Sequence, residues 1–210
     1  ADTSLINTYH AVVFTEYLYD ENGDLIREGE GETYNYKTIP AEAGYAVLDG
    51  LFITGGNADG SLQEYDNKGG GVVAEPYTHI RNCIVRGNTA SGEGGGIYQK
   101  AGAIVSGTLV TDNDADMGGG IYVDGETGDG ETLSYIVAST IVENNSSGEG
   151  GGIYFTGRQL NVNSSVVWGN TANYAKDVYG NYGSDDDKYL FSYVAVENLQ
   201  IPGLNNRCLL

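Results

Sequence analysis

The sequence predicts an all-β solenoid, in which short strands stack on one another turn after turn. The first observation is a motif that recurs at intervals of 25, 32 and 25 residues, a period within the range of repeat proteins. The second is that the stretches between Gly-rich turns are β-branched runs of four to six residues, which favour strands. Helical repeats would need longer amphipathic stretches, and none occurs between these turns.

The composition supports one folded domain and argues against several partners. The chain has 210 residues, of which 33 are Gly and only 3 are Pro, and 40% are hydrophobic, so it can bury a substantial core. Its formal charge of −19 argues against binding nucleic acid or an anionic membrane surface, because both require Lys and Arg. No run of 18 apolar residues occurs, so we expect no membrane insertion within this chain.

The repeated motif joins a β-branched strand that ends in Asn to a Gly triplet followed by Ile-Tyr. The strand part occurs at residues 84–88, 109–113, 141–145 and 166–170, and the Gly part at 94–98, 118–122 and 150–154. The fourth copy keeps only Asp177-Val178-Tyr179. The interval of 32 residues exceeds the period by 7, and we place this insertion in the polar loop near residues 124–131.

Aligning the copies gives columns of residues that should lie directly above one another. The inward columns are Ile80, Val105, Val137 and Val162, then Val85, Val110, Val142 and Val167, and the small-residue column Cys83, Thr108, Thr140 and Ser165. An Asn column, formed by Asn88, Asn113, Asn145 and Asn170, should fix a bend by bonding from turn to turn. The Gly triplets should form a corner where close backbone approach or a positive φ excludes a Cβ.

The ends of the chain differ from the regular middle. We expect a single β-helix domain over residues 1–210, in which 1–45 form an entry strand and a hairpin excursion, 46–180 the regular repeats, and 181–210 a loop and a last strand or cap. Asn22-Gly23 is the hairpin turn signal, and residues 191–196 are the last strand. The apolar tail suggests that the chain is part of a longer protein, because an uncapped solenoid exposes an adhesive edge.

The V-x-x-N and G-G-x-I pattern resembles the repeat of polymorphic outer-membrane proteins and of related secreted bacterial β-helix proteins. Their repeat has F-x-x-N, where this chain has Val, and G-G-[AIL]-[IV], where this chain has a third Gly. The resemblance covers about residues 5–180 and implies a right-handed parallel β-helix of the pectin-lyase-like kind, with about five or six turns. It also implies an extracellular or outer-membrane location. It does not specify a function, because the same fold serves adhesins, lyases and hydrolases.

The candidate ligand-binding residues are a column of tyrosines that follows the Gly triplets. Side chains alternate along a strand, so with Ile97, Ile121, Ile153 and Val178 pointing inward, the neighbouring residues should point outward: Tyr98, Tyr122, Tyr154 and Tyr179. An exposed strip of this kind would suit a glycan or a partner protein. In the alternative, the stacked tyrosines only cover the sheet and pair with one another.

A second outward column is apolar and consists of Ile84, Leu109, Ile141 and Val166. We expect residues 14–45 to cover it, and the alternative is an interaction patch.

The candidate metal ligands are Asp112, Asp114 and Asp116, whose spacing resembles the start of a calcium loop. The loop is not an EF-hand, because Met117 replaces the expected Gly and Val123 the bidentate Glu. We therefore expect no dedicated cofactor, with weak Ca²⁺ binding as the alternative to ordinary solvated carboxylates.

No catalytic residues can be assigned from the sequence. Glycoside hydrolysis needs paired carboxylates, but Asp112 aligns with Gly87, Asn144 and Gly169, and the 10 basic residues do not align either. The sequence therefore favours a non-catalytic extracellular bacterial surface protein, an adhesion or binding stem that presents a repeat face to a glycan or to a host or bacterial surface protein. The alternative is a polysaccharide lyase or glycoside hydrolase built on a pectin-lyase-like β-helix.

Overall fold

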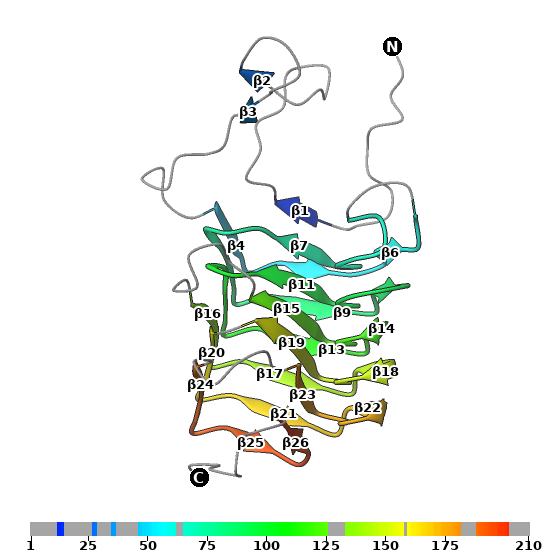
Figure 1. Cartoon of the computed structure of the whole chain (residues 1–210), viewed down its shortest axis with the longest axis vertical. Helices are drawn as coiled ribbons and strands as arrows, with labels where there is room; N and C mark the ends of the chain where they lie inside the picture. The colour runs from blue at the N-terminus through cyan, green and yellow to red at the C-terminus, as the bar shows by residue number, and fades with distance from the viewer. Residues whose placement is uncertain are drawn as a thin grey trace.

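A computed structural model of the chain has four parallel sheets that wind into a β-helix (Figure 1). The structure describes residues 46–61, 65–125, 133–157, 159–181 and 188–201, and the backbone of short strands at 12–14, 27–28 and 35–36. No helix occurs within these ranges. The predicted fold class is confirmed.

One turn of the solenoid passes through four sheets, which we number I to IV in chain order. Sheet I contains β4 (Ala46–Asp49), β8 (Thr78–Arg81), β12 (Ile104–Ser106), β16 (Ser134–Val137), β20 (Gln159–Asn163) and β24 (Lys188–Ser192). Sheet II contains β5 (Phe52–Ile53), β9 (Ile84–Arg86), β13 (Leu109–Thr111), β17 (Thr140–Val142), β21 (Val166–Trp168) and β25 (Ala195–Val196).

The other two sheets complete the turn. Sheet III contains β6 (Asn57–Ala58), β10 (Thr89–Ala90), β14 (Asp114–Met117), β18 (Asn145–Glu149) and β22 (Thr171–Tyr174). Sheet IV contains β1 (Val12–Phe14), β7 (Val72–Ala74), β11 (Ile97–Lys100), β15 (Ile121–Gly125), β19 (Ile153–Gly157), β23 (Val178–Asn181) and β26 (Leu199–Gln200).

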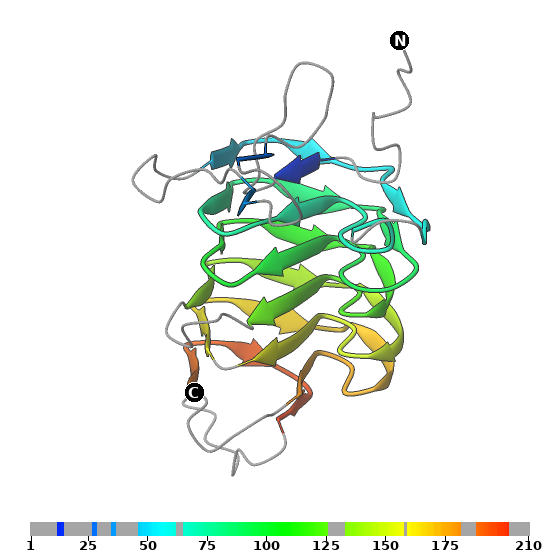
Figure 2. The ribbon, with the colours of Figure 1, turned by 45° about the horizontal axis from the view of Figure 1, so that its top comes forward.

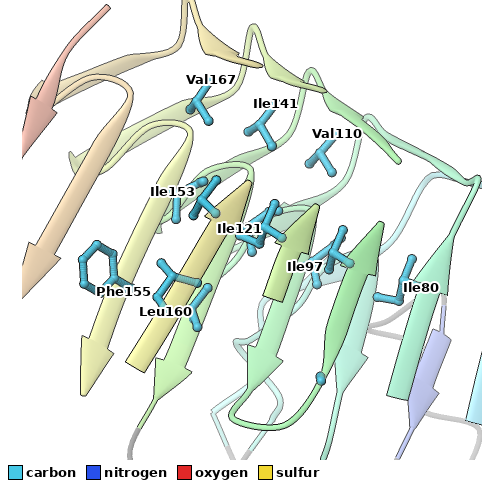
Figure 3. Packing of buried hydrophobic residues seen from close by; sticks show 14 of the residues in the cluster. Ile80, Ile97, Val110, Ile121, Ile141, Ile153, Phe155, Leu160 and Val167 are labelled. Atoms are coloured by element: carbon cyan, nitrogen blue, oxygen red, sulfur yellow. The ribbon is translucent and has the colours of Figure 1, made fainter. Parts of the chain in front are cut away.

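The core is a stack of mainly aliphatic side chains from sheets I, II and IV, with Phe155 among them (Figure 3). On sheet II the inward column is Val85, Val110, Ile141 and Val167. The prediction that Val142 belongs to this column is wrong. Val142 pairs with Thr111, which in turn pairs with Arg86, and the column they form lies on the outer side of the sheet. The same one-residue shift places Ile136, not Val137, in the inward column of sheet I.

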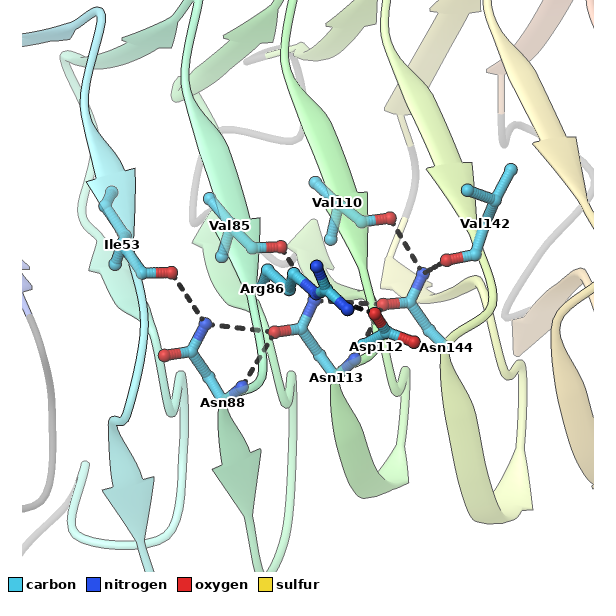
Figure 4. A network of polar contacts seen from close by, with 9 residues as sticks. All are labelled: Ile53, Val85, Arg86, Asn88, Val110, Asp112, Asn113, Val142 and Asn144. Carbon is cyan, nitrogen blue, oxygen red and sulfur yellow. Dashed lines mark hydrogen bonds and ion pairs between the residues drawn. The ribbon is translucent and has the colours of Figure 1, made fainter.

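An asparagine ladder forms the corner between sheets II and III (Figure 4). Its members are Asn88, Asn113, Asn144 and Asn170, all buried; the predicted Asn145 is instead exposed on β18. In each step, the backbone N and the side-chain Nδ2 of one Asn donate to Oδ1 of the next, at 2.9–3.1 Å. The second Nδ2 proton goes to a carbonyl of the preceding turn, such as Val85 O for Asn113. Every amide is therefore satisfied in the interior.

Asp177 ends the ladder in place of a fifth asparagine. Its Oδ1 accepts from the backbone N and Nδ2 of Asn170, at 3.1 and 2.9 Å, and its Oδ2 accepts from the backbone N of Asn198 at 3.0 Å. The last turn passes from β25 to β26 without a strand on sheet III. A carboxylate suits this end because both of its oxygens only accept.

A hydroxyl ladder forms the corner between sheets I and II and explains the buried free Cys83. The backbone N of Cys83 donates to Thr108 Oγ1, that of Thr108 to Ser139 Oγ, and that of Ser139 to Ser165 Oγ. Each hydroxyl in turn donates to the carbonyl two residues before it. Cys83 occupies the first place of this ladder, and Ser139 holds the place predicted for Thr140.

The Gly triplets form the corner between sheets III and IV, as predicted, and each member has its own reason to be Gly. The first member has a positive φ, for example 64° at Gly118. A Cβ on the second, Gly119, would lie 2.0 Å from Asn145 O, and one on the third, Gly120, 2.6 Å from Gly152 O. Consecutive turns therefore meet backbone to backbone at this corner.

The N-terminal residues extend the helix by one strand, β1, which pairs in parallel with β7. Strands β2 (Arg27–Glu28) and β3 (Asn35–Tyr36) form an antiparallel pair at the N-terminal end of the stack (Figures 1 and 2). The predicted turn at Asn22-Gly23, residues 126–131 of the predicted polar insertion and residues 202–210 lie outside the described residues.

We expect Asp177→Ala to destabilise the protein by about 1–3 kcal/mol, because it leaves the buried Asn170 donors without an acceptor. Urea unfolding followed by circular dichroism measures the change. Asp177→Asn should lose less, since it keeps one acceptor oxygen. An Asp177→Ala variant as stable as the parent chain would contradict the capping role.

We expect Gly119→Ala to destabilise the protein by about 3 kcal/mol or more, because its Cβ would overlap a backbone carbonyl that cannot move away. The matched control is Lys176→Ala at the equivalent place of the final repeat, where the residue is exposed, and this change should alter stability by less than about 0.5 kcal/mol. Thermal unfolding of both variants would test the contrast, and equal melting temperatures would refute it.

Candidate functional site

The tyrosine column follows the outer side of sheet IV. Tyr98, Tyr122 and Tyr154 pair in register across β11, β15 and β19, and Tyr179 follows on β23. Successive ring centroids lie 5.5, 5.1 and 5.2 Å apart. The column packs as a cluster separate from the main core, so its direction away from that core is as predicted.

The hydroxyls of the first three tyrosines in the column each bond one turn onward. Tyr98 donates to Asp124 Oδ2 at 2.8 Å, Tyr122 bonds the side chain of Thr156, and Tyr154 that of Asn181. The partner is in each case the outward residue two positions after the next tyrosine. Rings and hydroxyls are therefore both engaged within the protein.

The expected exposure of this strip is corrected by the structure. Tyr98, Tyr122 and Tyr154 are only 2%, 7% and 4% exposed. Tyr65 packs against Tyr98 with ring centroids 5.9 Å apart, and Lys68 Nζ lies 4.9 Å from the centroid of the same ring. Alternation along a strand gives the direction of a side chain but not what lies over it. Here the residues just before the Gly triplets, such as Tyr65 and Met117, pack over the rings. Ligand binding by this column stays untested, and the stacked arrangement matches the covering role.

A buried carboxylate lies beside the first tyrosine of the column. Glu75 is 1% exposed, accepts a hydrogen bond from the Tyr65 hydroxyl, and has Lys100 Nζ 3.5 Å from its Oε1. Lys100 also lies 5.3 Å from the centroid of the Tyr65 ring. These contacts hold the Tyr65 cover over the column, which makes Glu75 a structural residue in this arrangement.

The three candidate metal ligands do not converge. Asp112 pairs with Arg86, with 2.7 Å between Oδ2 and Nε (Figure 4). Asp114 accepts from Asn145 Nδ2, and Asp116 accepts from Ser147 Oγ at 2.8 Å. Within the described residues, no group of three or more His, Cys, Asp or Glu is placed to hold a metal ion. Calcium binding itself stays a prediction.

The alignment of Asp112 with Asn144 is also wrong. Glu143 takes that place, since Gly87, Asp112, Glu143 and Gly169 share a positive φ at the same corner. Two exposed carboxylates therefore lie on adjacent turns, a pairing that the sequence alignment missed because Asn144 and Asn145 are adjacent and either fits the motif.

A second polar pair lies on the outer side of sheet I. His79 Nε2 and Ser106 Oγ are 2.8 Å apart, a nucleophile–base distance. Burial, followed by the nearby Arg81, lowers the pKa of His79. The backbone amides around this pair belong to the strand ladders, so they are not available to stabilise an oxyanion.

The outer face of sheet II is apolar and exposed. Its large side chains have exposed fractions of 60% for Phe52, 40% for Ile84, 39% for Val166 and 49% for Trp168. Phe52, Ile84, Leu109, Thr140 and Val166 pair in register from β5 to β21. We call these five residues, together with Trp168 on β21, the apolar face. Residues 14–45, which we expected to cover this column, lie outside the described residues apart from the backbone of Phe14 and of two short strands at 27–28 and 35–36. Thr140 stands in this column in place of the predicted Ile141.

Sequence reasoning missed Phe52 and Trp168 as members of this surface. Trp168 lies within the motif copy 166–170 but in a column of unlike residues, and Phe52 precedes the four aligned copies. The register between strands shows that Phe52 pairs with Ile84 and that Trp168 pairs with Val142. Within the described residues, no helix is long and apolar enough to cross a membrane.

Alkaline pH should unfold the protein through the tyrosine column. Burial, followed by nearby carboxylates such as Asp124 for Tyr98 and Glu93 for Tyr122, raises the pKa of both hydroxyls above their usual value. A raised folded-state pKa gives stability that is complete below about pH 10 and is lost at higher pH. We expect absorbance at 295 nm to show these phenols ionising together with unfolding. Ionisation of all 17 tyrosines while the circular dichroism signal stays native would contradict this.

Comparison with known families identifies the repeat. Residues 82–100 and 139–156 match the Chlamydia polymorphic membrane protein repeat. Each match spans one strand of sheet II, one of sheet III and one of sheet IV, with an Asn of the ladder and a Gly triplet between them. No curated protein and no solved structure gives a significant match to the chain. The protein is thus a parallel β-helix, two segments of which are similar to the repeat of polymorphic membrane proteins.

Proposed function

We propose that this chain is the non-catalytic binding stem of a bacterial surface protein, and that it holds a partner protein on the apolar face of sheet II. The observation that carries the proposal is the group of exposed large side chains on this face, among them Phe52 at 60% and Trp168 at 49%. Exposed apolar patches that follow a flat sheet are typical of interaction sites. Trp and Phe are also enriched in the buried cores of protein interfaces, and Trp is common among the residues that dominate binding energy.

Charge selects the kind of partner. Because the formal net charge of the chain is −19, two copies would repel one another when brought face to face. The apolar face also contains the Arg86–Asp112 pair and exposed Glu143 at its edge toward sheet III. A neutral or basic protein surface with an apolar centre fits this face better than a second copy does.

The repeat match supports display at the cell surface. The matched family is described as a membrane protein repeat, and the regular stack gives a rigid extended body suited to holding a face away from an anchor. An extracellular or outer-membrane location is therefore part of the proposal. Protease treatment of intact cells, with an epitope tag inserted in the chain, would test it; a tag that stays protected would count against surface display.

Adhesion of coated beads tests the binding role. Beads carrying the purified chain should adhere to cultured cells, and the double variant Phe52→Ser/Trp168→Ser should reduce the number of bound beads about tenfold, because anchor side chains dominate interface energy. The matched control is Tyr174→Ser, which removes a 50% exposed aromatic side chain from sheet III. Circular dichroism would show that all three proteins are folded.

Two outcomes would overturn the proposal. The first is equal adhesion by parent and double variant, which would place the partner elsewhere. The second is release of reducing ends or unsaturated sugars from polysaccharides, lost in Asp112→Asn or Glu143→Gln, which would support the hydrolase or lyase alternative.

A further inference from the structure

The outer face of sheet III carries two columns of short polar side chains. Asn57, Thr89, Asp114, Asn145 and Thr171 pair in register across its five strands. Two residues further along each turn lie Asp59, Ser91, Asp116, Ser147 and Asn173. All ten residues are exposed, and the residue between each pair is small: Ala58, Ala90, Ala115, Ser146 and Ala172. We call these ten residues the polar face.

Hydrogen bonds between turns hold much of the polar face in place. Thr171 Oγ1 donates to Asn145 Oδ1 at 2.7 Å, and Asn145 Nδ2 donates to Asp114 Oδ1. In the second column, Ser147 Oγ donates to Asp116 Oδ1 at 2.8 Å. A surface ordered before binding loses less entropy when a ligand arrives.

These internal bonds determine which chemistry the polar face offers. They use the Thr171 and Ser147 protons and one proton of Asn145, while each carboxylate retains lone pairs. The polar face therefore presents mainly hydrogen-bond acceptors. Its three carboxylates, Asp59, Asp114 and Asp116, are its formal charges, and no Lys or Arg stands among its ten members. A ligand for it should supply hydrogen-bond donors and carry no negative charge.

The size of the polar face selects the shape of the ligand. Four strand spacings give a length of about 19 Å, and two residues along a strand give a width between columns of about 7 Å. Such a strip is far smaller than the roughly 800 Å² that each partner buries in a stable protein complex. An extended peptide normally joins a sheet at its edge, where backbone groups are free, and not on a face. A single polymer chain with hydroxyl groups along its length fits both the strip and its acceptors.

We propose that the polar face binds a neutral polysaccharide chain lying along the axis of the solenoid. Each turn contributes two polar side chains, so successive sugars meet the same pair of columns. The inference concerns a different face from the apolar one and does not depend on partner binding there.

Native affinity electrophoresis would test this site. Gels would contain hydroxyethyl cellulose, galactomannan or arabinoxylan as neutral polymers, and polygalacturonate as an anionic one. The parent chain should be retarded by at least one neutral polymer, equally with EDTA and with Ca²⁺. The double variant Asp114→Ala/Asp116→Ala should raise the dissociation constant about tenfold, because hydrogen bonds to charged acceptors are lost.

Two further variants sharpen the test. The control Asp49→Ala/Glu197→Ala removes the same charge from exposed positions outside the polar face and should bind as the parent does. Ser91→Lys removes no carboxylate and places a long side chain at the middle of a column, so it should also weaken binding.

Three results would overturn the proposal. They are absence of retardation by every neutral polymer, unchanged binding in both polar-face variants, and retention that requires Ca²⁺ or favours polygalacturonate. The last would identify a cation site instead. Adhesion of beads depends on Phe52 and Trp168, so failure there would leave this result unaffected.

Discussion

The constraint on which the structure depends is that each turn must hydrogen-bond directly onto the next at the strand spacing, about 4.8 Å. Every residue is then in contact with its counterpart one turn away, so each position must be compatible with a copy of itself. Asparagine meets this condition in the interior, because its side chain both donates to and accepts from the next one. Glycine meets it where backbones touch, as at Gly119. The repeated motif therefore consists of residue types that can pack against the same residue type one turn away.

The same constraint gives each outer face a uniform chemistry. Because a position repeats in every turn, one residue type produces a strip along the whole solenoid. Sheet IV carries tyrosines, sheet II exposed aliphatic and aromatic side chains, and sheet III short polar ones. Three tyrosines of the strip are buried, and Tyr65 and Lys68 pack over the first of them, Tyr98. The faces of sheets II and III, in contrast, present rows of exposed side chains.

Much of the fold could be predicted because the Gly triplets and the V-x-x-N strand are local signals. The alignment failed by one residue at Asn144-Asn145, since two adjacent asparagines fit the motif equally and only the register of the ladder distinguishes them. The exposure of Tyr98 could not be predicted, because its cover comes from a different turn. The polar face had a signal in the triplets 57–59, 89–91, 114–116, 145–147 and 171–173, which becomes meaningful only once their register is known.

Regular stacking also bears on binding versus catalysis. An active site needs groups that differ from their neighbours, such as a nucleophile, a base and unpaired amides directed at one reacting atom. Around His79 and Ser106 the backbone amides pair within the strand ladders of β8 and β12. The groups that this face presents to a ligand are therefore side chains. A repeated row of side chains favours an extended or flat partner that meets many equivalent groups at once. The departure from regularity at Asp177, which ends the asparagine ladder, completes the hydrogen bonding of the stack by accepting from Asn170 and Asn198.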